Sequence, residues 1–312
     1  MRRFVVTISS ATALACAFGA GCATTHEANW SDKPAAVAPT AEGATAATTA
    51  ATEGDELWKG RADKAKLAAA LAKWEEAAKA APTAELTAKL ARGHYLMGDG
   101  FLALEDDQAG RDAEYQKGLD WATTALKLGA PDFASAMAGN GKHAEAIKLA
   151  PKEAVPAMYW YAANLGKWAA SKGFATKLKY KDDLKATMEH VKSLEPEFFY
   201  AAAWRYFGGY EAATAGIAGG SLDKSKENFE KAIQLAPNYF GTKVLYADYL
   251  CTKLQKDTDG DGISDGKKKF KELLDSVIAA DPNVDPEIAA ENTIEQAKAK
   301  KLLAQIDQLF AS

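Results

Sequence analysis

Amphipathic segments that end in a proline recur along the chain from residue 56 onwards. Four of them span residues 73–82, 188–196, 229–237 and 274–282, and a fifth, with one extra residue, ends at Pro131. Residues three apart share one face of a helix, so the apolar stripe in each segment predicts an amphipathic helix. The proline, which lacks a backbone donor, ends that helix. The stripes are Trp74, Ala77 and Ala80; Ala122, Ala125 and Leu128; Met188, Val191 and Leu194; Phe229, Ala232 and Leu235; and Leu274, Val277 and Ala280.

The stripe resembles the second helix of the tetratricopeptide repeat (TPR), and FEKAIQLAPNY at 229–239 is a close match. Pro237 and Pro282 are 45 residues apart, and removing the Asp/Gly-rich loop between them leaves a spacing near the ~34 residues of that repeat. We therefore predict an all-α protein, an irregular TPR-like solenoid of helical hairpins over residues 55–312. An amphipathic helix at 291–310 would cap it at the C-terminus. A generic bundle of proline-terminated helices is the alternative.

The first residues have the pattern of an export signal. Two arginines precede an apolar run from residue 4 to residue 18, and small residues lead to Cys22. This pattern predicts a signal peptide over residues 1–21, and its end resembles a bacterial lipobox, in which the cysteine is lipidated. Gly19 departs from the usual leucine, and the alternative is an ordinary signal cut at Ala20 or Gly21, which would leave a soluble periplasmic protein. We expect lipid attachment at Cys22 and a periplasmic, membrane-anchored protein, with Ala23 favouring the outer membrane.

Residues 22–54 are predicted to be a disordered tether. Ala and Thr fill 18 of the 32 positions from 23 to 54, and Trp30 and Val37 are the only large apolar residues there. Such a segment has too little apolar surface to offset the entropy of ordering the chain. The folded part is therefore expected to be attached to the membrane through a flexible segment.

Charge and cysteine content narrow the classes of function. The 312 residues carry 38 basic and 42 acidic side chains, a net charge of −4, which gives no reason to expect nucleic-acid binding. A mean hydropathy of −0.26 excludes a protein with many membrane spans. Once the signal is removed and Cys22 is lipidated, Cys251 has no disulfide partner, and we expect it to be a buried apolar residue.

Catalytic motifs are missing or stand in the wrong context. The four histidines, His26, His94, His143 and His190, show no metal-ligand spacing. One GxSxG pattern, at 262–266, lies in an acidic loop, whereas a nucleophile elbow needs a strand before it and a helix after it. We therefore expect no enzymatic activity.

The acidic loop at 257–266 is a candidate calcium site. Its sequence, DTDGDGISDG, resembles the calcium loops of thrombospondin type 3 and dockerin modules. Oxygen ligands at alternate positions can converge on one Ca²⁺ because Gly262 permits a sharp turn. Lys268 replaces the bidentate glutamate of an EF-hand, which predicts weak binding and a structural role; a metal-free polar turn is the alternative. The expected ligands are Asp257, Asp259, Asp261, the carbonyl of Ile263, and Asp265.

Two aromatic-rich segments are candidates for a groove or a pore. They are MYWYAANLGKWA at 158–169 and WRYFGGY at 204–210. Helical solenoids present the first helices of their hairpins on a concave surface, although packing between repeats accounts for most aromatic residues at such positions. The candidate ligand or pore residues are Tyr159, Asn164, Lys167, Arg205 and Tyr210.

The same segments are similar to a known family. The runs YWYAANLGKWA (159–169), WRYFGGYEAA (204–213), GGSLDKSKENFEKAIQLAPNYFGTKVLYADY (219–249) and AEN (290–292) resemble the TatT family. Its members are lipoproteins associated with tripartite ATP-independent periplasmic (TRAP) transporters. The resemblance covers roughly residues 56–310, and the acidic loop and the Ala/Thr-rich tether depart from a generic member.

The resemblance implies a repeat-built homotrimer with a central pore. It also implies a partnership with the periplasmic solute-binding protein of the transporter and a role in the uptake of small organic ligands, hydrophobic ones included. The family's motifs do not define its ligand contacts. The alternative function is a general TPR lipoprotein scaffold for the assembly of envelope proteins.

Overall fold

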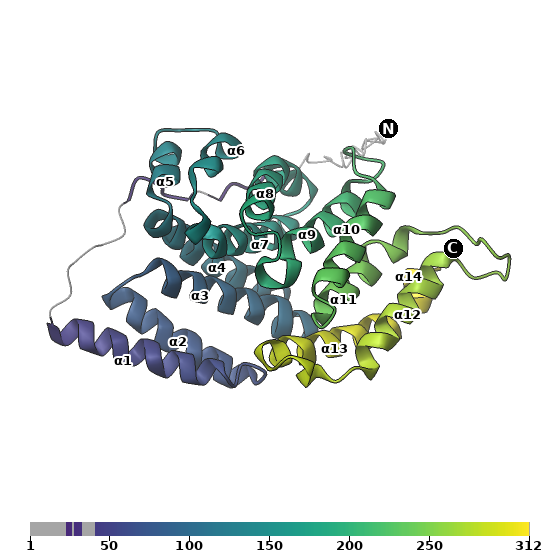
Figure 1. Ribbon diagram of the computed structural model, residues 1–312, viewed down its shortest axis with the longest axis horizontal. Coiled ribbons are helices and arrows are strands. Elements are labelled where there is room, and N and C mark those ends of the chain that lie inside the picture. Colours follow the sequence, from purple (N-terminus) through teal and green to yellow (C-terminus); the bar gives the residue numbers. More distant parts are fainter. Residues whose placement is uncertain (1–22, 27, 33–40, 312) are drawn as a thin grey trace, which may run out of the picture.

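The computed structural model describes residues 23–26, 28–32 and 41–311, and this part of the chain contains helices and turns but no β-strand (Figure 1). The predicted signal peptide and Cys22 lie outside the described residues. The all-α prediction is confirmed. The helices are α1 (Ala41–Trp58), α2 (Lys64–Ala80), α3 (Ala84–Leu96), α4 (Gln108–Gly129), α5 (Pro131–Ala138), α6 (His143–Ala146), α7 (Val155–Ser171), α8 (Phe174–Leu194), α9 (Phe198–Thr214), α10 (Leu222–Leu235), α11 (Phe240–Tyr249), α12 (Asp265–Ala279), α13 (Ala289–Ala304) and α14 (Ile306–Leu309), and a π-helical turn spans Met97–Leu102.

The five helices predicted from the proline-ended stripes are present as α2, α4, α8, α10 and α12. Each ends two or three residues before its proline, because a proline disfavours helical geometry in the residue that precedes it. In all five stripes the first two positions are buried, and the third is partly or fully exposed in the last turn. The stripe therefore marks the helix face that packs into the core.

Consecutive helices pair into hairpins that stack along the molecule (Figure 1). The pairs are α1 with α2, α3 with α4, α7 with α8, α9 with α10, and α11 with α12, whereas α5 and α6 are short helices inserted between the second and third pairs. Contacts of α7 with α3 and α4, and of α11 with α9 and α10, join one hairpin to the next. The predicted solenoid of helical hairpins is confirmed.

A glycine in one helix makes room for the large residue of the next stripe. The ring of Phe229 in α10 lies so close to Gly208 in α9 that a Cβ at this glycine would come within 2.6 Å of it. The other side of the hairpin is equally close-packed, because the ring of Phe229 stacks on Tyr246 of α11 with a centroid distance of 5.1 Å. One aromatic side chain thus joins two hairpins. Cys251, on the same side of the molecule, is fully buried, as expected.

Residues 41–54 differ from the disorder expected of them, because they form most of α1. Ala47 and Ala50 are buried, and α1 packs along α2. Gly54 leaves space for the ring of Trp74, whose Nε1 donates a hydrogen bond to Asp55 at 3.1 Å. Alanine has the highest intrinsic helix propensity, and alanine-rich faces let two helices approach closely. The Ala/Thr composition therefore predicted too little structure in this segment.

Residues 23–32 also contact the folded part. Trp30 packs edge-on against Phe133 of α5, with ring centroids 5.1 Å apart, and it contacts Tyr161 of α7. The backbone N–H of Thr24 donates to the hydroxyl of Thr176 in α8 at 2.9 Å. The predicted tether therefore includes a docked stretch near its start.

The last long helix, α13, does more than cap the stack. It packs on α11 and α12, and it also reaches the N-terminal hairpins (Figure 1). The carboxylate of Glu291 accepts hydrogen bonds from Arg61 at 2.8 Å and from Arg92 at 2.6 Å, and both the Arg61 and Glu291 side chains are less than a tenth exposed. Next to it, the side chain of Asn292 accepts the backbone N–H of Phe240 at 3.1 Å. The AEN run thus joins the two ends of the solenoid.

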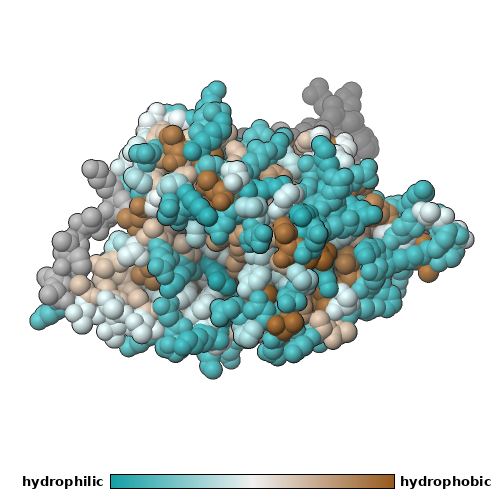
Figure 2. All heavy atoms as spheres, in the orientation of Figure 1, coloured by the Kyte–Doolittle hydropathy of each residue, from teal (hydrophilic) through white to brown (hydrophobic). Residues whose placement is uncertain are grey.

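Hydrophilic residues cover most of the face drawn in Figure 2, and apolar side chains reach that surface only in separate small areas. Among the described residues, no helix is both long enough and apolar enough to cross a membrane.

Candidate functional site

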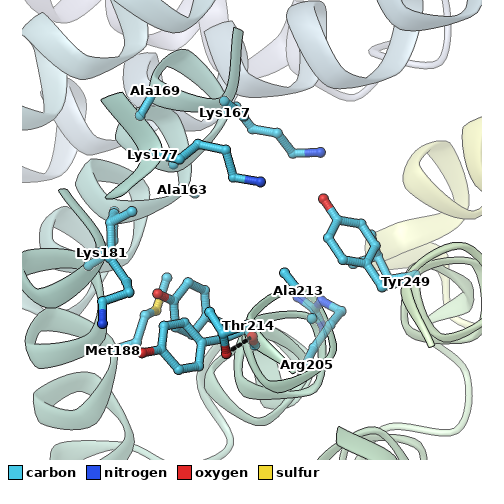
Figure 3. Close-up of a pocket in the computed structure, with 18 of the residues that line it drawn as sticks. Ala163, Lys167, Ala169, Lys177, Lys181, Met188, Arg205, Ala213, Thr214 and Tyr249 are labelled. Carbon is cyan, nitrogen blue, oxygen red and sulfur yellow. Dashed lines mark hydrogen bonds between the residues drawn. The ribbon is translucent and has the colours of Figure 1, made fainter. Parts of the chain in front are cut away.

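A pocket with largely apolar walls lies between α7, α8 and α9, and we call it the apolar pocket (Figure 3). It has a volume of about 270 Å³. Small residues on α7 and α9 leave the space open, while larger apolar side chains from α8 and the α9–α10 turn close it. Its apolar lining includes Ala163, Ala170, Phe174, Leu178, Leu184, Met188, Ala213 and Ile217.

All four charged side chains that line the apolar pocket are basic. They are Lys167, Lys177, Lys181 and Arg205, and no aspartate or glutamate lines the pocket. Figure 3 shows the amino group of Lys177 directed into the open space. Within the described residues, no carboxylate lies at ion-pair distance from Lys177, whereas Lys181 pairs with its neighbour Asp182 at 3.3 Å. The pocket therefore combines apolar walls with a positive charge.

Arg205 is buried, and carbonyl groups rather than a carboxylate hold its guanidinium. Its Nη1 donates to the carbonyl of Tyr200 at 2.9 Å, and its Nη2 lies 3.4 Å from the carbonyl of Phe199. Residues 199–201 have φ values of 42°, 58° and 58°, a left-handed turn that costs of order 1–3 kcal/mol per residue without glycine. The guanidinium also lies over the ring of Tyr239, with 4.3 Å between the carbon and the centroid. Arg205 thus stabilises a strained turn beside the pocket.

A second pocket, which we call the ionic pocket, has a volume of about 420 Å³. It lies between the Met97–Leu102 turn, α11 and α13, and both signs of charge line it. Asp99 is its central carboxylate, 2.5 Å from the ammonium of Lys167 and 2.7 Å from that of Lys298. Burial raises the pKa of Asp99, but the two ammonium groups outweigh burial and hold this pKa well below its usual range.

Six side chains line both pockets and form a shared wall between them. Lys167 belongs to this wall, and its ammonium pairs with the carboxylate of Asp99 in the ionic pocket. Burial also raises the pKa of the Tyr95 hydroxyl well above its usual value, so this wall residue is neutral. The shared wall consists of Tyr95, Tyr159, Lys167, Arg205, Leu245 and Tyr249.

Four of the five candidate ligand residues lie at these pockets. Tyr159, Lys167 and Arg205 belong to the shared wall, and Tyr210 lines the apolar pocket. Asn164 lines neither pocket. It is fully buried, and its side-chain amide donates to the carbonyls of Ala91 at 3.1 Å and Trp160 at 2.8 Å. Asn164 therefore joins α7 to α3, as the packing alternative expected.

The pocket residues that sequence reasoning missed include Lys177, Lys181 and Tyr249. The two lysines are four positions apart at the start of α8, and this spacing places them on one helix face. That spacing was the signal available in the sequence. Tyr249 reaches the shared wall from α11, a hairpin away along the chain, and no local pattern marked it.

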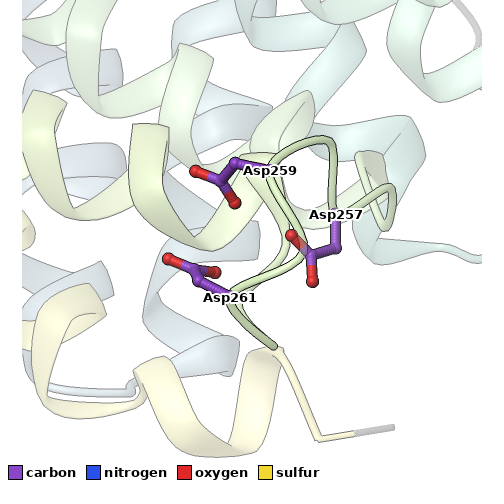
Figure 4. Close-up of side chains that lie close together, drawn as sticks. All are labelled: Asp257, Asp259 and Asp261. Carbon is purple, nitrogen blue, oxygen red and sulfur yellow. The ribbon is translucent and has the colours of Figure 1, made fainter.

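The acidic loop brings three of its aspartates together. Carboxylate oxygens of Asp257, Asp259 and Asp261 lie within 4.8 Å of one another (Figure 4). The ammonium of Lys268 lies 2.5 Å from Asp259 and 2.9 Å from Asp261, and it lowers the pKa of Asp259. The carboxylates thus converge as a cation requires, and a lysine already neutralises part of their charge.

The other two predicted calcium ligands are placed differently. The carboxylate of Asp265 accepts the backbone N–H of Thr258 at 3.2 Å and so closes the loop. The side chain of Ile263 is 44% exposed, and its backbone N–H donates to Asp261 at 2.9 Å. Calcium binding by this loop stays a prediction.

The fold and the two pockets define an all-α, helical-repeat protein with an apolar pocket of about 270 Å³. The family model of the TRAP transporter T-component matches residues 92–310, more than two thirds of the chain. The protein belongs to this family, as its resemblance to TatT predicted. No curated protein matches the chain. The family is a component of a transporter rather than a class of enzyme, and both pockets lie within the matched residues.

Proposed function

We propose that this T-component is a lipid-anchored periplasmic protein that docks the solute-binding protein of its TRAP transporter and assists the uptake of a small organic ligand. The observation that carries the proposal is the apolar pocket, which is built from the segments that resemble TatT most closely. Clefts of this kind, with apolar walls and few polar groups, are the usual sites for small ligands.

The lining of the pocket supports a ligand that has an apolar body and an acidic group. Four basic side chains line the pocket, and none of its lining residues is acidic. A cation in a partly dehydrated site is stabilised by an anion or by hydrogen bonds. Lys177 has no carboxylate partner among the described residues and is therefore the side chain that we assign to the ligand's acidic group.

Other parts of the proposal rest on the sequence and on family membership. The signal pattern that ends at Cys22 supports lipid anchoring and a periplasmic location, in the outer membrane by preference. Family membership supports association with a TRAP transporter. Docking of the solute-binding protein and assembly into a homotrimer are the finer parts of the proposal.

The decisive measurement is co-purification of the mature chain with the solute-binding protein of the same transporter at low salt. We expect a stoichiometric complex, and sedimentation of the mature chain alone should give three times the mass of one chain. No complex under these conditions would overturn the transport role. Binding of several unrelated envelope proteins with similar affinity would instead favour the general scaffold.

Ligand binding is tested separately with 1-anilinonaphthalene-8-sulfonate, which has an apolar body and one negative charge. We expect saturable fluorescence that a variant with a filled pocket, Ala163→Trp, loses. Equal binding by the wild type and this variant would contradict the pocket assignment while leaving docking open to the first measurement.

A further inference from the structure

Residues 24–26 run along α8 in the direction of that helix, so followed back from 26 to 24 they lead toward its N-terminal end. The backbone N–H of His26 donates to the hydroxyl of Tyr180 at 2.7 Å, and that of Thr24 donates to Thr176 at 2.9 Å. Two residues of extended chain cover about 7 Å, and four residues of helix rise about 6 Å. Residues 24–26 are therefore extended and parallel to α8.

The same direction is visible on α7. Trp30 contacts Tyr161, near the start of α7, whereas His26 packs edge-on against Trp168, near its end, with centroids 5.7 Å apart. The chain thus approaches the α7–α8 turn as it is followed back from residue 30 to residue 24. Cys22 lies outside the described residues.

The mouth of the apolar pocket lies at this same end of α8. Phe174, the first residue of α8, is 64% exposed, and Ile217, in the α9–α10 turn, is 67% exposed. Both line the pocket, together with Leu178, which is 49% exposed. These three are half of the large apolar side chains that are exposed in the described part of the chain.

Basic residues surround these apolar side chains. The segment KGFATKLKYK at 172–181 contains four lysines and no acidic residue. Lys172 pairs with Asp112 at 2.8 Å, whereas Lys177 has no such partner among the described residues. Aromatic and aliphatic side chains flanked by lysines are typical of surfaces that lie on anionic lipid headgroups.

We propose that Phe174, Leu178 and Ile217, together with Lys181, form a membrane-contact face, so that the apolar pocket opens onto the anionic bilayer that holds the N-terminal lipid. This inference rests on the anchoring at Cys22 proposed above. The three apolar side chains enter the headgroup region, and Lys181 extends to the phosphates. An amphipathic ligand then passes between bilayer and pocket without crossing water.

The test measures which part of the protein touches lipid when its N-terminus is held at a membrane. A hexahistidine tag replaces residues 1–22, and the protein binds vesicles of phosphatidylethanolamine and phosphatidylglycerol that contain a nickel-chelating lipid. A nitrobenzoxadiazole label is placed at Ile217→Cys or, as a control, at Val284→Cys. Val284 is 48% exposed between α12 and α13, outside the pocket lining. Cys251 is buried and is replaced by alanine in all variants.

We expect doxyl-labelled lipids to quench the label at position 217 several-fold more than the label at position 284. Adding Phe174→Ser and Leu178→Ser should remove this difference, whereas adding Leu149→Ser, an equally exposed apolar residue outside the pocket lining, should leave it unchanged. Equal quenching at the two positions, or stronger quenching at 284, overturns the membrane-contact face.

The anchor is tested by mass spectrometry of the N-terminal peptide of the native protein. A peptide without lipid at Cys22 would refute the proposed anchor, whereas the quenching experiment does not depend on that modification. Failure of the proposed anchoring and failure of the membrane-contact face therefore give different results.

Discussion

The two pockets share a wall, yet they are built in opposite ways. Consecutive hairpins line most of the apolar pocket, and the ammonium of Lys177 faces its open space (Figure 3). The ionic pocket brings together residues from both ends of the matched region, such as Asp99 with Lys298, and these charges neutralise one another. A buried ion pair compensates its own desolvation cost only when its partners are in place. The comparison teaches that the ionic pocket joins the ends of the solenoid, whereas the apolar pocket is left for a ligand.

The largest effect is expected for Glu291→Gln, which tests whether the charges of the ionic pocket join the ends of the solenoid. This change leaves the buried guanidinium of Arg61, and that of Arg92, without a carboxylate, and we expect the free energy of unfolding to fall by about 3–5 kcal/mol. Urea denaturation measures it. The control is Glu287→Gln in the turn just before α13, whose side chain is exposed and whose change should alter stability by less than about 0.5 kcal/mol. A similar loss of unfolding free energy in both variants would contradict the conclusion that the ion pairs of Glu291 join the two ends of the solenoid.

Acid should weaken the ionic pocket through Asp99. The folded-state pKa of Asp99 is depressed, so its stabilising contribution is present above the unfolded value of 3.8 and is lost as the pH falls below it. We expect the difference in unfolding free energy between the wild type and Asp99→Asn to be largest at neutral pH and to shrink below pH 3.8. Urea denaturation over a pH series measures it. A difference that does not change with pH would show that Asp99 does not act through its charge.

Filling the apolar pocket should abolish binding with little effect on the fold. Ala163 lines this pocket and is partly buried, so the indole in Ala163→Trp occupies the space of the ligand. We expect the affinity for the anionic probe to fall by more than about tenfold, or 1.4 kcal/mol. Fluorescence titration measures it, and the matched control is Ala136→Trp on α5, outside both pockets. Unchanged binding in the first variant would place the probe elsewhere.

Removing one free charge should have a smaller effect. Lys177→Gln removes the ammonium and leaves a polar, uncharged side chain, and we expect the affinity for the anionic probe to fall by less than about tenfold because the group is exposed. The loss should decrease at high salt. The comparison variant is Lys152→Gln, an exposed lysine outside both pockets, which should bind the probe as the wild type does.

The smallest effect is expected for calcium binding by the acidic loop, which lies outside both pockets. We expect weak calcium binding, with a Kd of about 10⁻⁴–10⁻³ M, because the ammonium of Lys268 competes for the same carboxylates. Calorimetric titration should show tighter binding for Lys268→Gln and none for Asp259→Ala. Equal heats from all three proteins would remove calcium from the description of this loop.

Local periodicity accounted for much of the fold and for most of the candidate site. The stripe at Phe229 and Ala232 predicted a helix face that the structure buries, and the aromatic segments predicted Tyr159, Lys167 and Arg205 at the pockets. Helical spacing made Asn164 a candidate ligand residue, but Asn164 lines neither pocket. A polar side chain on a helix can either face a ligand or donate a hydrogen bond to the backbone of a neighbouring helix. Only the tertiary structure decides between these two roles, because it brings the carbonyl of Ala91 next to the amide of Asn164.

The sequence by itself determined where the five proline-ended helices run, where they end and which face each one buries, because spacing and proline act within a few residues. It also indicated the family and the pattern of an export signal. Tertiary structure alone decided that the Ala/Thr-rich residues 41–54 form a helix, because their small faces gain stability only against α2. It also placed Glu291 between Arg61 and Arg92. Such contacts span most of the chain, and no local pattern encodes them.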